Sequence, residues 1–132
     1  MQRMEDIIGR VCSGLVARCD GQSESVDSLP WNAHPAFAGV ELKHLVTGAD
    51  TQGATSLHVV RVAPGCSIGE HVHSPQWELH EVLAGSGECF MDGLGVAYAP
   101  GVTRILPPDR PHEVRAGKEG LHLLAVFAPA LV

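Results

Sequence analysis

The sequence has no long apolar run, no cluster of basic residues and no closely paired cysteines. None of its apolar stretches approaches the roughly 20 residues that a helix needs to cross a bilayer. The 132 residues include 9 Lys and Arg and 15 Asp and Glu, which gives a formal net charge of −6. Nucleic-acid-binding proteins and lipid-binding helices usually carry basic patches or stripes, and none is present. We therefore expect no nucleic-acid partner and no membrane partner.

The cysteines do not follow a disulfide framework. The chain has four, none in a CxxC pair and none at dense spacing, namely Cys12, Cys19, Cys66 and Cys89. The N-terminal segment MQRMEDIIGRVCSG carries charged residues inside its apolar pattern, which is not typical of a secretory signal. We expect a cytoplasmic protein whose reduced thiols pack as small apolar side chains.

Apolar residues make up 45% of the chain, enough for one compact core in a single domain of this length. Apolar residues recur at helical spacing near the start, at Met4, Ile7, Ile8, Val11 and Leu15. They predict a helix over residues 3–18, ended by Asp20-Gly21, within an N-terminal arm of residues 1–20. The polar segment 21–35 reads as a linker.

Residues 36–132 contain short strand-like runs separated by Gly, Pro and Asp. Examples are VELKHLV, SLHVVRVA, GVTRILP and LHLLAVFA. Short strands with few helices between them predict an all-β barrel or sandwich.

The stretch PGCSIGEHVHSPQWELHEVLAGSG, residues 64–87, carries a possible metal site. His71 and His73 lie two residues apart, so on a strand they share one face. Glu78 lies at an odd offset from His73 and would face the other way on an unbroken strand. A reversal at Ser74-Pro75-Gln76 removes this difficulty, because Pro75 favours a turn. We therefore predict a short turn between the histidines and Glu78.

A second segment, GVTRILPPDRPHEV, ends a strand in a Pro/Asp turn and begins the next strand at His112. Three imidazoles and one carboxylate suit one divalent transition metal ion, such as Fe, Mn, Ni, Zn, Co or Cu. Four protein ligands leave coordination positions open on an octahedral ion, as a reactive site requires.

These two segments resemble the two motifs of the cupin superfamily. The first motif is matched at every spacing, by Gly65, His71, His73, Glu78 and Gly85. The second is matched by Gly101, Pro107 and His112, whereas Asp109 stands where Gly is usual and Ala116 where Asn is usual. The resemblance is to small single-domain bacterial cupins.

The resemblance implies a double-stranded β-helix, the jelly-roll barrel of cupins, over residues 36–132, with a short helix before it. It implies that His71, His73, Glu78 and His112 hold the metal, and that the protein forms a homodimer. If Glu78, His80, Val82 and Ala84 face the pocket, then Leu79 and Leu83 face outward and need cover from the helix or a second subunit.

Other residues have either a functional or a purely structural role. His80 shares the inward face of Glu78 and is a candidate for proton transfer or ligand support. Gln76 and Trp77 adjoin the turn at the mouth of the barrel. Arg61 and Arg104 either lie on the surface or bind a substrate carboxylate, and their direction is open. We assign structural roles to the remaining histidines, His34, His44, His58 and His122.

Two classes of function follow. One is a metal-dependent enzyme acting on a small organic acid, ketone or phenol, either as a dioxygenase or by Lewis-acid chemistry, as an isomerase or decarboxylase would. The other is a non-catalytic module that binds or senses a metal and a small molecule.

Overall fold

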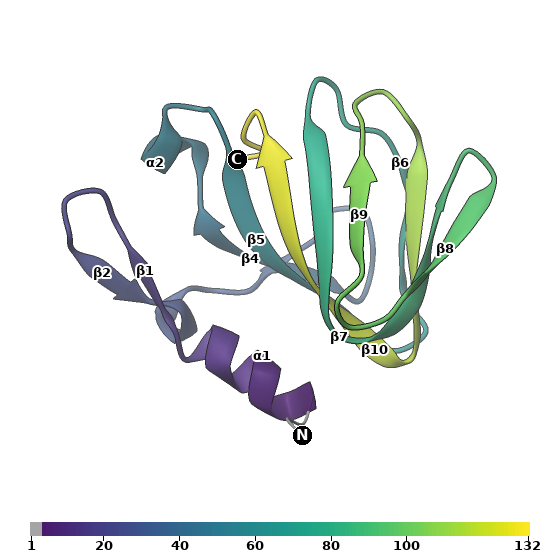
Figure 1. Ribbon diagram of the computed structural model, residues 1–132, viewed down its shortest axis with the longest axis horizontal. Coiled ribbons are helices and arrows are strands. Elements are labelled where there is room, and N and C mark those ends of the chain that lie inside the picture. The colour runs from purple at the N-terminus through teal and green to yellow at the C-terminus, as the bar shows by residue number, and fades with distance from the viewer. Residues whose placement is uncertain (1–3) are drawn as a thin grey trace.

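The computed structural model describes residues 4–132 as a β-barrel with N-terminal elements packed outside it (Figure 1). The helices are α1 (Met4–Cys12) and α2 (Gly48–Thr51), with a 3-10 turn η1 (Val26–Ser28). The strands are β1 (Leu15–Ala17), β2 (Ser23–Ser25), β3 (Asn32–Ala33), β4 (Val40–Val46), β5 (Ser56–Val62), β6 (Ser67–His71), β7 (Trp77–Met91), β8 (Leu94–Tyr98), β9 (Thr103–Leu106) and β10 (His112–Ala128).

Two long strands, β7 and β10, run antiparallel along the whole barrel and belong to both of its walls. The first part of β10, residues 112–116, pairs with β6 and with the end of β7. The second part, residues 121–128, pairs with β5 and with the start of β7. Strands β9 and β8 pair with the first and second parts of β7 in the same way. This is the expected all-β jelly roll with a short N-terminal helix.

Both long strands bend where Gly85 lies against Gly120. Gly85 has φ 85° and Gly120 has φ 77°. A Cβ atom on Gly85 would lie 2.1 Å from the carbonyl oxygen of Gly120. Only glycine permits this approach and this backbone conformation together, which explains why the first motif ends in glycine.

The barrel interior holds the main core, whose fully buried members include Val82, Leu106, Leu121 and Leu123. Along β7 the predicted alternation is confirmed, since Glu78, His80, Val82 and Ala84 are all buried. On the opposite face of the strand, Leu79 remains 39% exposed.

The N-terminal segment covers part of the outer wall. Val26, Leu45 and Val59 form a second core with partly buried side chains of the segment, Val11, Val16, Leu29 and Trp31. The helix is shorter than predicted. It ends at Cys12, and Leu15–Ala17 instead form strand β1, which pairs with β2. Asp20-Gly21 therefore turns a hairpin rather than ending a helix, because Val16 and its neighbours gain a strand partner.

The segment 21–35 also has structure that its polar composition did not predict. It contains β2, η1 and β3, and β3 extends the sheet beside β4. Among the described residues, no helix has the length and apolar character needed to span a membrane.

Candidate metal centre

Four side chains from three strand ends converge inside one end of the barrel. His71 ends β6, His73 follows it, Glu78 is the second residue of β7 and His112 begins β10. His71 and His112 are register partners in the β6–β10 ladder, and their ring centroids are 4.3 Å apart. One ligand atom from each of the four residues lies within 4.8 Å of all the others. The structure thus brings together the four residues proposed as ligands.

The turn before Glu78 has the predicted place. The Ser74–Pro75 peptide bond is cis, and the chain reverses between His73 and β7. The loop before His112 is tied to this turn, because the backbone N–H of Asp109 donates to the carbonyl of His73 at 2.9 Å. Asp109 has φ 65°, in the left-handed region. This explains the departure from the motif, since aspartate is one of the few side chains that tolerate the conformation usually given to glycine there.

Backbone carbonyls orient two of the imidazoles. Nδ1 of His71 lies 2.7 Å from the carbonyl oxygen of Gly69, and Nδ1 of His112 lies 3.1 Å from that of Arg110. A carbonyl accepts only, so each Nδ1 carries a proton. In the neutral ring Nε2 then keeps its lone pair, whereas in protonated His112 the Nε2–H group donates to Glu78. These contacts set the tautomer that a metal ligand needs.

Glu78 is 5% exposed and lies among the imidazoles. Its Oε1 is 3.1 Å from Nε2 of His112 and 3.6 Å from Nε2 of His73. Burial alone would raise the pKa of Glu78, but the adjacent His80 and the hydrogen bonds from His112 and His80 outweigh it and lower that pKa. The carboxylate is therefore charged and ready to bind a cation.

Burial acts on the histidines in the opposite sense. It lowers the pKa of His71 to about 4 and also lowers the pKa of His73. Burial opposes the charged form of His112 too, but its contact with Glu78 raises the pKa of His112. At neutral pH, His71 and His73 offer unprotonated nitrogens, as metal ligation requires.

His80 connects this cluster to a residue that the sequence did not single out. Its Nε2 lies 2.5 Å from Oε2 of Glu78, and its Nδ1 lies 2.9 Å from the hydroxyl of Tyr98. Tyr98 and His80 are 1% and 2% exposed. Burial and the neighbouring thiol of Cys89 raise the pKa of Tyr98, so its hydroxyl keeps its proton. Glu78, His80 and Tyr98 therefore form a buried hydrogen-bond network.

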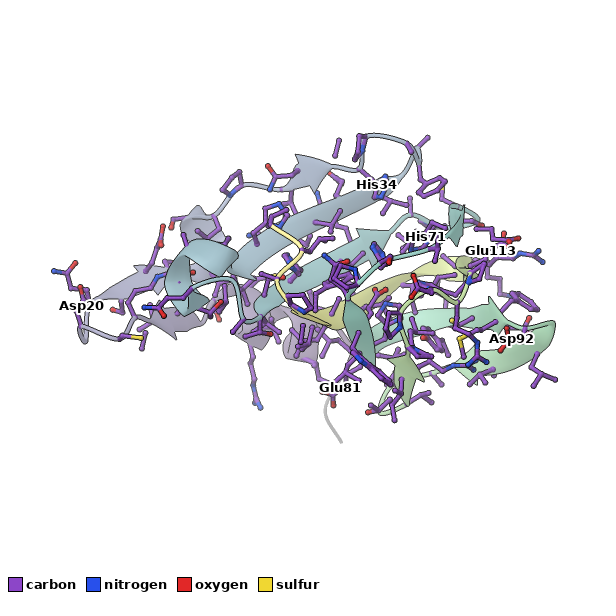
Figure 2. All side chains as sticks on the ribbon, turned by 90° about the horizontal axis from the view of Figure 1, so that it is seen from above. Asp20, His34, His71, Glu81, Asp92 and Glu113 are labelled. Atoms are coloured by element: carbon purple, nitrogen blue, oxygen red, sulfur yellow. The ribbon has the colours of Figure 1, made fainter. Side chains whose placement is uncertain are left out.

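A cavity of about 50 Å³ adjoins the cluster, several times the roughly 10–15 Å³ that one water needs. Its polar lining is His34, His71, His73, Glu78 and His80, and its apolar lining is Val40, Leu42, Val60, Ile68, Phe127 and Leu131. Figure 2, which looks down on the barrel from above, shows His34 and His71 near each other, with Glu81 pointing away at the edge. His34, assigned a structural role from sequence, therefore belongs to the pocket.

The other histidines lie outside the pocket lining. Buried His58 contacts His44 through their Nδ1 atoms at 2.8 Å and contacts the hydroxyl of Ser56 at 2.8 Å. His122 lies beside Arg61 in a separate surface depression.

The two arginines left open by the sequence differ from each other. Arg61 is a surface residue that pairs with Glu41 at 2.8 Å and stacks on Trp31. Arg104 stands opposite His80 in the β7–β9 ladder and is half-buried, on the same side of the sheet as buried Leu106.

Gln76 and Trp77 lie where the turn predicts them. Gln76 donates to the carbonyl of Ala130 at 3.4 Å, beside the last residues of the chain, and Trp77 is exposed.

The donor set fits a first-row divalent ion. Imidazole nitrogen and carboxylate oxygen are ligands for Zn, Fe, Ni, Cu and Mn, and the absence of a thiolate among the four does not favour a closed structural zinc site. The fold and the cluster together define a small β-barrel with four potential metal ligands beside a pocket.

Comparisons with known proteins support this fold and identify its family. The family model of the cupin domain matches residues 58–127, and the chain belongs to this family. In sequence, the chain is 31% identical over 97 residues to the dimethylsulfoniopropionate lyase DddW of Ruegeria pomeroyi, which covers 73% of this chain. The chain spans only 63% of the length of that relative.

Solved structures show the same fold. A predicted oxalate decarboxylase from Thermotoga maritima superimposes with a TM-score of 0.69 and 24% identity, covering 78% of this chain and 95% of its own. The dimethylsulfoniopropionate lyase DddQ of Ruegeria pomeroyi gives a TM-score of 0.69 and 20% identity, covering 80% of this chain and 59% of its own. An RmlC-like cupin from Shewanella frigidimarina superimposes with a TM-score of 0.69 and 17% identity, covering 80% of this chain and 87% of its own.

Proposed function

We propose that this protein is a metal-dependent lyase that acts on a small carboxylate. One divalent transition metal is held by His71, His73, Glu78 and His112, and the reaction removes a proton from the carbon next to the carboxylate while a leaving group departs from the following carbon. The observation that carries the proposal is the open cluster of three imidazoles and one carboxylate beside the small cavity that His80 also lines.

The charge of the site supports an anionic substrate. Three neutral imidazoles, one carboxylate and a divalent ion sum to a single positive charge, in a pocket whose other walls are apolar. A bound ion would act there as a Lewis acid that polarises the substrate carboxylate and so acidifies the adjacent C–H bond. The similarity to a dimethylsulfoniopropionate lyase favours this chemistry over the oxygenase alternative.

His80 is our candidate for moving the proton. It lines the pocket, and both its ring nitrogens are already hydrogen-bonded, one to Glu78 and the other to Tyr98, so it takes up a substrate proton by releasing one of these contacts. At a metal concentration that saturates the variant, replacement of His80 by Gln should leave the metal content unchanged and lower turnover by about 10²-fold or more, the usual contribution of general acid–base catalysis. Unchanged turnover in His80→Gln with a verified substrate would return His80 to a structural role.

The function is tested with the purified protein after its metal has been identified by elemental analysis. Small carboxylates with a leaving group two carbons from the carboxylate carbon, dimethylsulfoniopropionate among them, are assayed for the unsaturated acid by ultraviolet absorbance. Dioxygen uptake is recorded in parallel. We expect product without oxygen uptake, lost in His73→Ala and retained in Glu81→Gln, whose side chain is exposed on the outer face of β7. Oxygen consumption coupled to turnover would indicate a dioxygenase, and tight binding without product a binding or sensing module.

We further propose that the protein is a cytoplasmic homodimer. The four cysteines are free, which fits a reducing compartment. Leu79 and Ile105 are register partners on the outer wall and are 39% and 60% exposed, which fits a second copy of the chain as their cover. Light scattering of the purified protein should give twice the chain mass, and Ile105→Glu should reduce it to one chain.

A further inference from the structure

His34 lies in the pocket without being one of the four clustered ligands. It follows β3, and its backbone N–H donates to the carbonyl of Val40 at 2.8 Å, which fixes it beside the start of β4. Its ring packs against Phe37 at a centroid distance of 4.7 Å, and Phe37 in turn lies 6.1 Å from the ring of His71. These contacts give the side chain a defined position in the pocket lining, near His71 (Figure 2).

The hydrogen bonding of His34 determines which nitrogen carries the proton. The backbone N–H of Ala36 donates to Nδ1 at 3.0 Å, so Nδ1 must keep its lone pair. Burial lowers the pKa of His34, which leaves the ring neutral at pH 7. A neutral imidazole whose Nδ1 accepts carries its proton on Nε2.

That Nε2–H group has no partner among the described residues, since the contact with Ala36 is the one hydrogen bond made by the ring. No described buried side-chain nitrogen or oxygen lacks a partner, so Nε2 must be open to solvent and to a ligand. His34 thus has a solvent-accessible N–H donor, and the residue lines the same cavity as His71, His73, Glu78 and His80.

We propose that the Nε2–H group of His34 donates a hydrogen bond to a second oxygen-bearing group of the bound small molecule, while its first such group is held at the metal site formed by the four clustered residues. The inference rests on the proposed function and deepens it. It assigns a substrate class with oxygen atoms at two ends, a dicarboxylate or an oxo acid, bound across a pocket whose other walls are apolar. His34 is then a residue that determines specificity rather than a ligand of the ion.

The contact with Ala36 alone does not require histidine. An Asn, Asp or Ser side chain makes the same hydrogen bond to a backbone N–H two residues further on. Asn at position 34 would keep that acceptor but lacks the ring that reaches over Phe37 and carries the second nitrogen. His34→Asn therefore separates the local structural role from the role toward a ligand.

The test uses the zinc-loaded protein and two probes of similar size, malonate and butyrate. Both have one carboxylate that can bind at the zinc site, and malonate alone has a second one for His34. Affinities are measured by calorimetry in the wild type, in His34→Asn and in His122→Asn, a half-buried histidine of a different surface depression. Zinc content is measured for each protein, and the ring N–H of His34 is followed by ¹H–¹⁵N correlation spectroscopy.

We expect His34→Asn to weaken malonate binding by about tenfold or more, as for the loss of one hydrogen bond to a charged group, and butyrate binding by less than about twofold. His122→Asn should change neither. In the wild type the proton should reside on Nε2 and its resonance should move on addition of malonate and not of butyrate.

Equal effects on both probes, or none, at normal zinc content would overturn the role of His34 alone. A wild-type protein that binds no zinc, or neither probe, would overturn the proposed function and this role with it.

Discussion

Replacing Glu78 by Gln should remove most of the thermal stabilisation that a divalent metal gives to this protein. The substitution keeps the size of the side chain and removes its charge at the centre of the cluster. Glu78 contributes the one carboxylate among four ligand atoms that lie within 4.8 Å of one another, and it is 5% exposed. Its loss therefore withdraws the only negative charge among the four clustered groups in a site shielded from solvent.

The magnitude follows from linkage between metal binding and folding. A metal at 100 times its Kd stabilises the folded state by about 2.7 kcal/mol. Unfolding entropy near 2.1 cal/mol/K per residue gives about 0.28 kcal/mol/K for 132 residues, so the melting temperature should rise by about 10 °C. Loss of a partner that only orients a ligand weakens metal binding by 10–100-fold, so loss of a ligand itself should weaken it by about 100-fold or more. At the same metal concentration the variant keeps about 0.4 kcal/mol, a rise of about 1–2 °C.

The assay is a thermal melt of metal-stripped protein with and without zinc, followed by circular dichroism. Glu81→Gln is the matched control, because it removes the same charge three residues further along β7 on the exposed side of the strand. The control should retain the full rise of the wild type. A full rise in Glu78→Gln would show that Glu78 is not a ligand, and equal losses in both variants would indicate a non-specific effect of charge.

Three further predictions concern the barrel that holds the site. Burial lowers the pKa of His58 from 6.5 to about 4, so the unfolded chain binds more protons between these values and the free energy of unfolding of metal-free protein should fall as pH falls through that window. Urea titrations of His58→Gln should show this fall reduced by up to about 3 kcal/mol, and an unchanged slope would contradict the assignment. Gly85→Ala should lower the free energy of unfolding by about 3 kcal/mol or more, since the new Cβ would meet the carbonyl of Gly120, whereas Gly93→Ala, with φ 74° and open space around it, should cost about 1 kcal/mol; equal losses would refute the close-approach argument. Asp109→Val should cost about 1–2 kcal/mol and reduce zinc content, because a β-branched residue resists φ 65°, while Asp109→Gly should be tolerated; full stability of the valine variant would show that this turn is not constrained.

The all-β class and the clustering of the four residues were predictable from local patterns, whereas the jelly-roll barrel followed from the resemblance of the two motifs to cupins. Alternation along β7 placed Glu78 and His80 on the inner face, and burial bears this out. The turn at Pro75 was required to bring Glu78 to the side of the HxH pair. The N-terminal helix was misjudged for a physical reason of the same kind. Its periodicity continues to Leu15, but residues 15–17 find a strand partner in β2, and pairing between segments cannot be read from a helical wheel.

Tyr98 and His34 could not be found from sequence because long-range pairing brings them to the site. Tyr98 reaches His80 because β8 pairs with the second half of β7 after the bend at Gly85. His34 reaches the pocket because β3 adds to the edge of β4. The polar residues around His34 in the sequence indicated a linker, and no spacing rule relates His34 to His71 and His73.

Burial decides how the cluster would work, and it couples metal binding to ligand choice. It keeps His71 and His73 neutral, so an ion would not have to displace protons from them, and it leaves Glu78 charged in a site with little water. When His112 is also neutral, the cluster carries one negative charge before a divalent ion enters and one positive charge afterwards; protonated His112, favoured by its contact with Glu78, would cancel the negative charge of the metal-free cluster. An anionic ligand should therefore bind the metal-loaded pocket more tightly than the metal-free one. The N–H group of His34 stays neutral whether or not a metal is bound. It can therefore discriminate among anions only once a bound metal has made the pocket attractive to them.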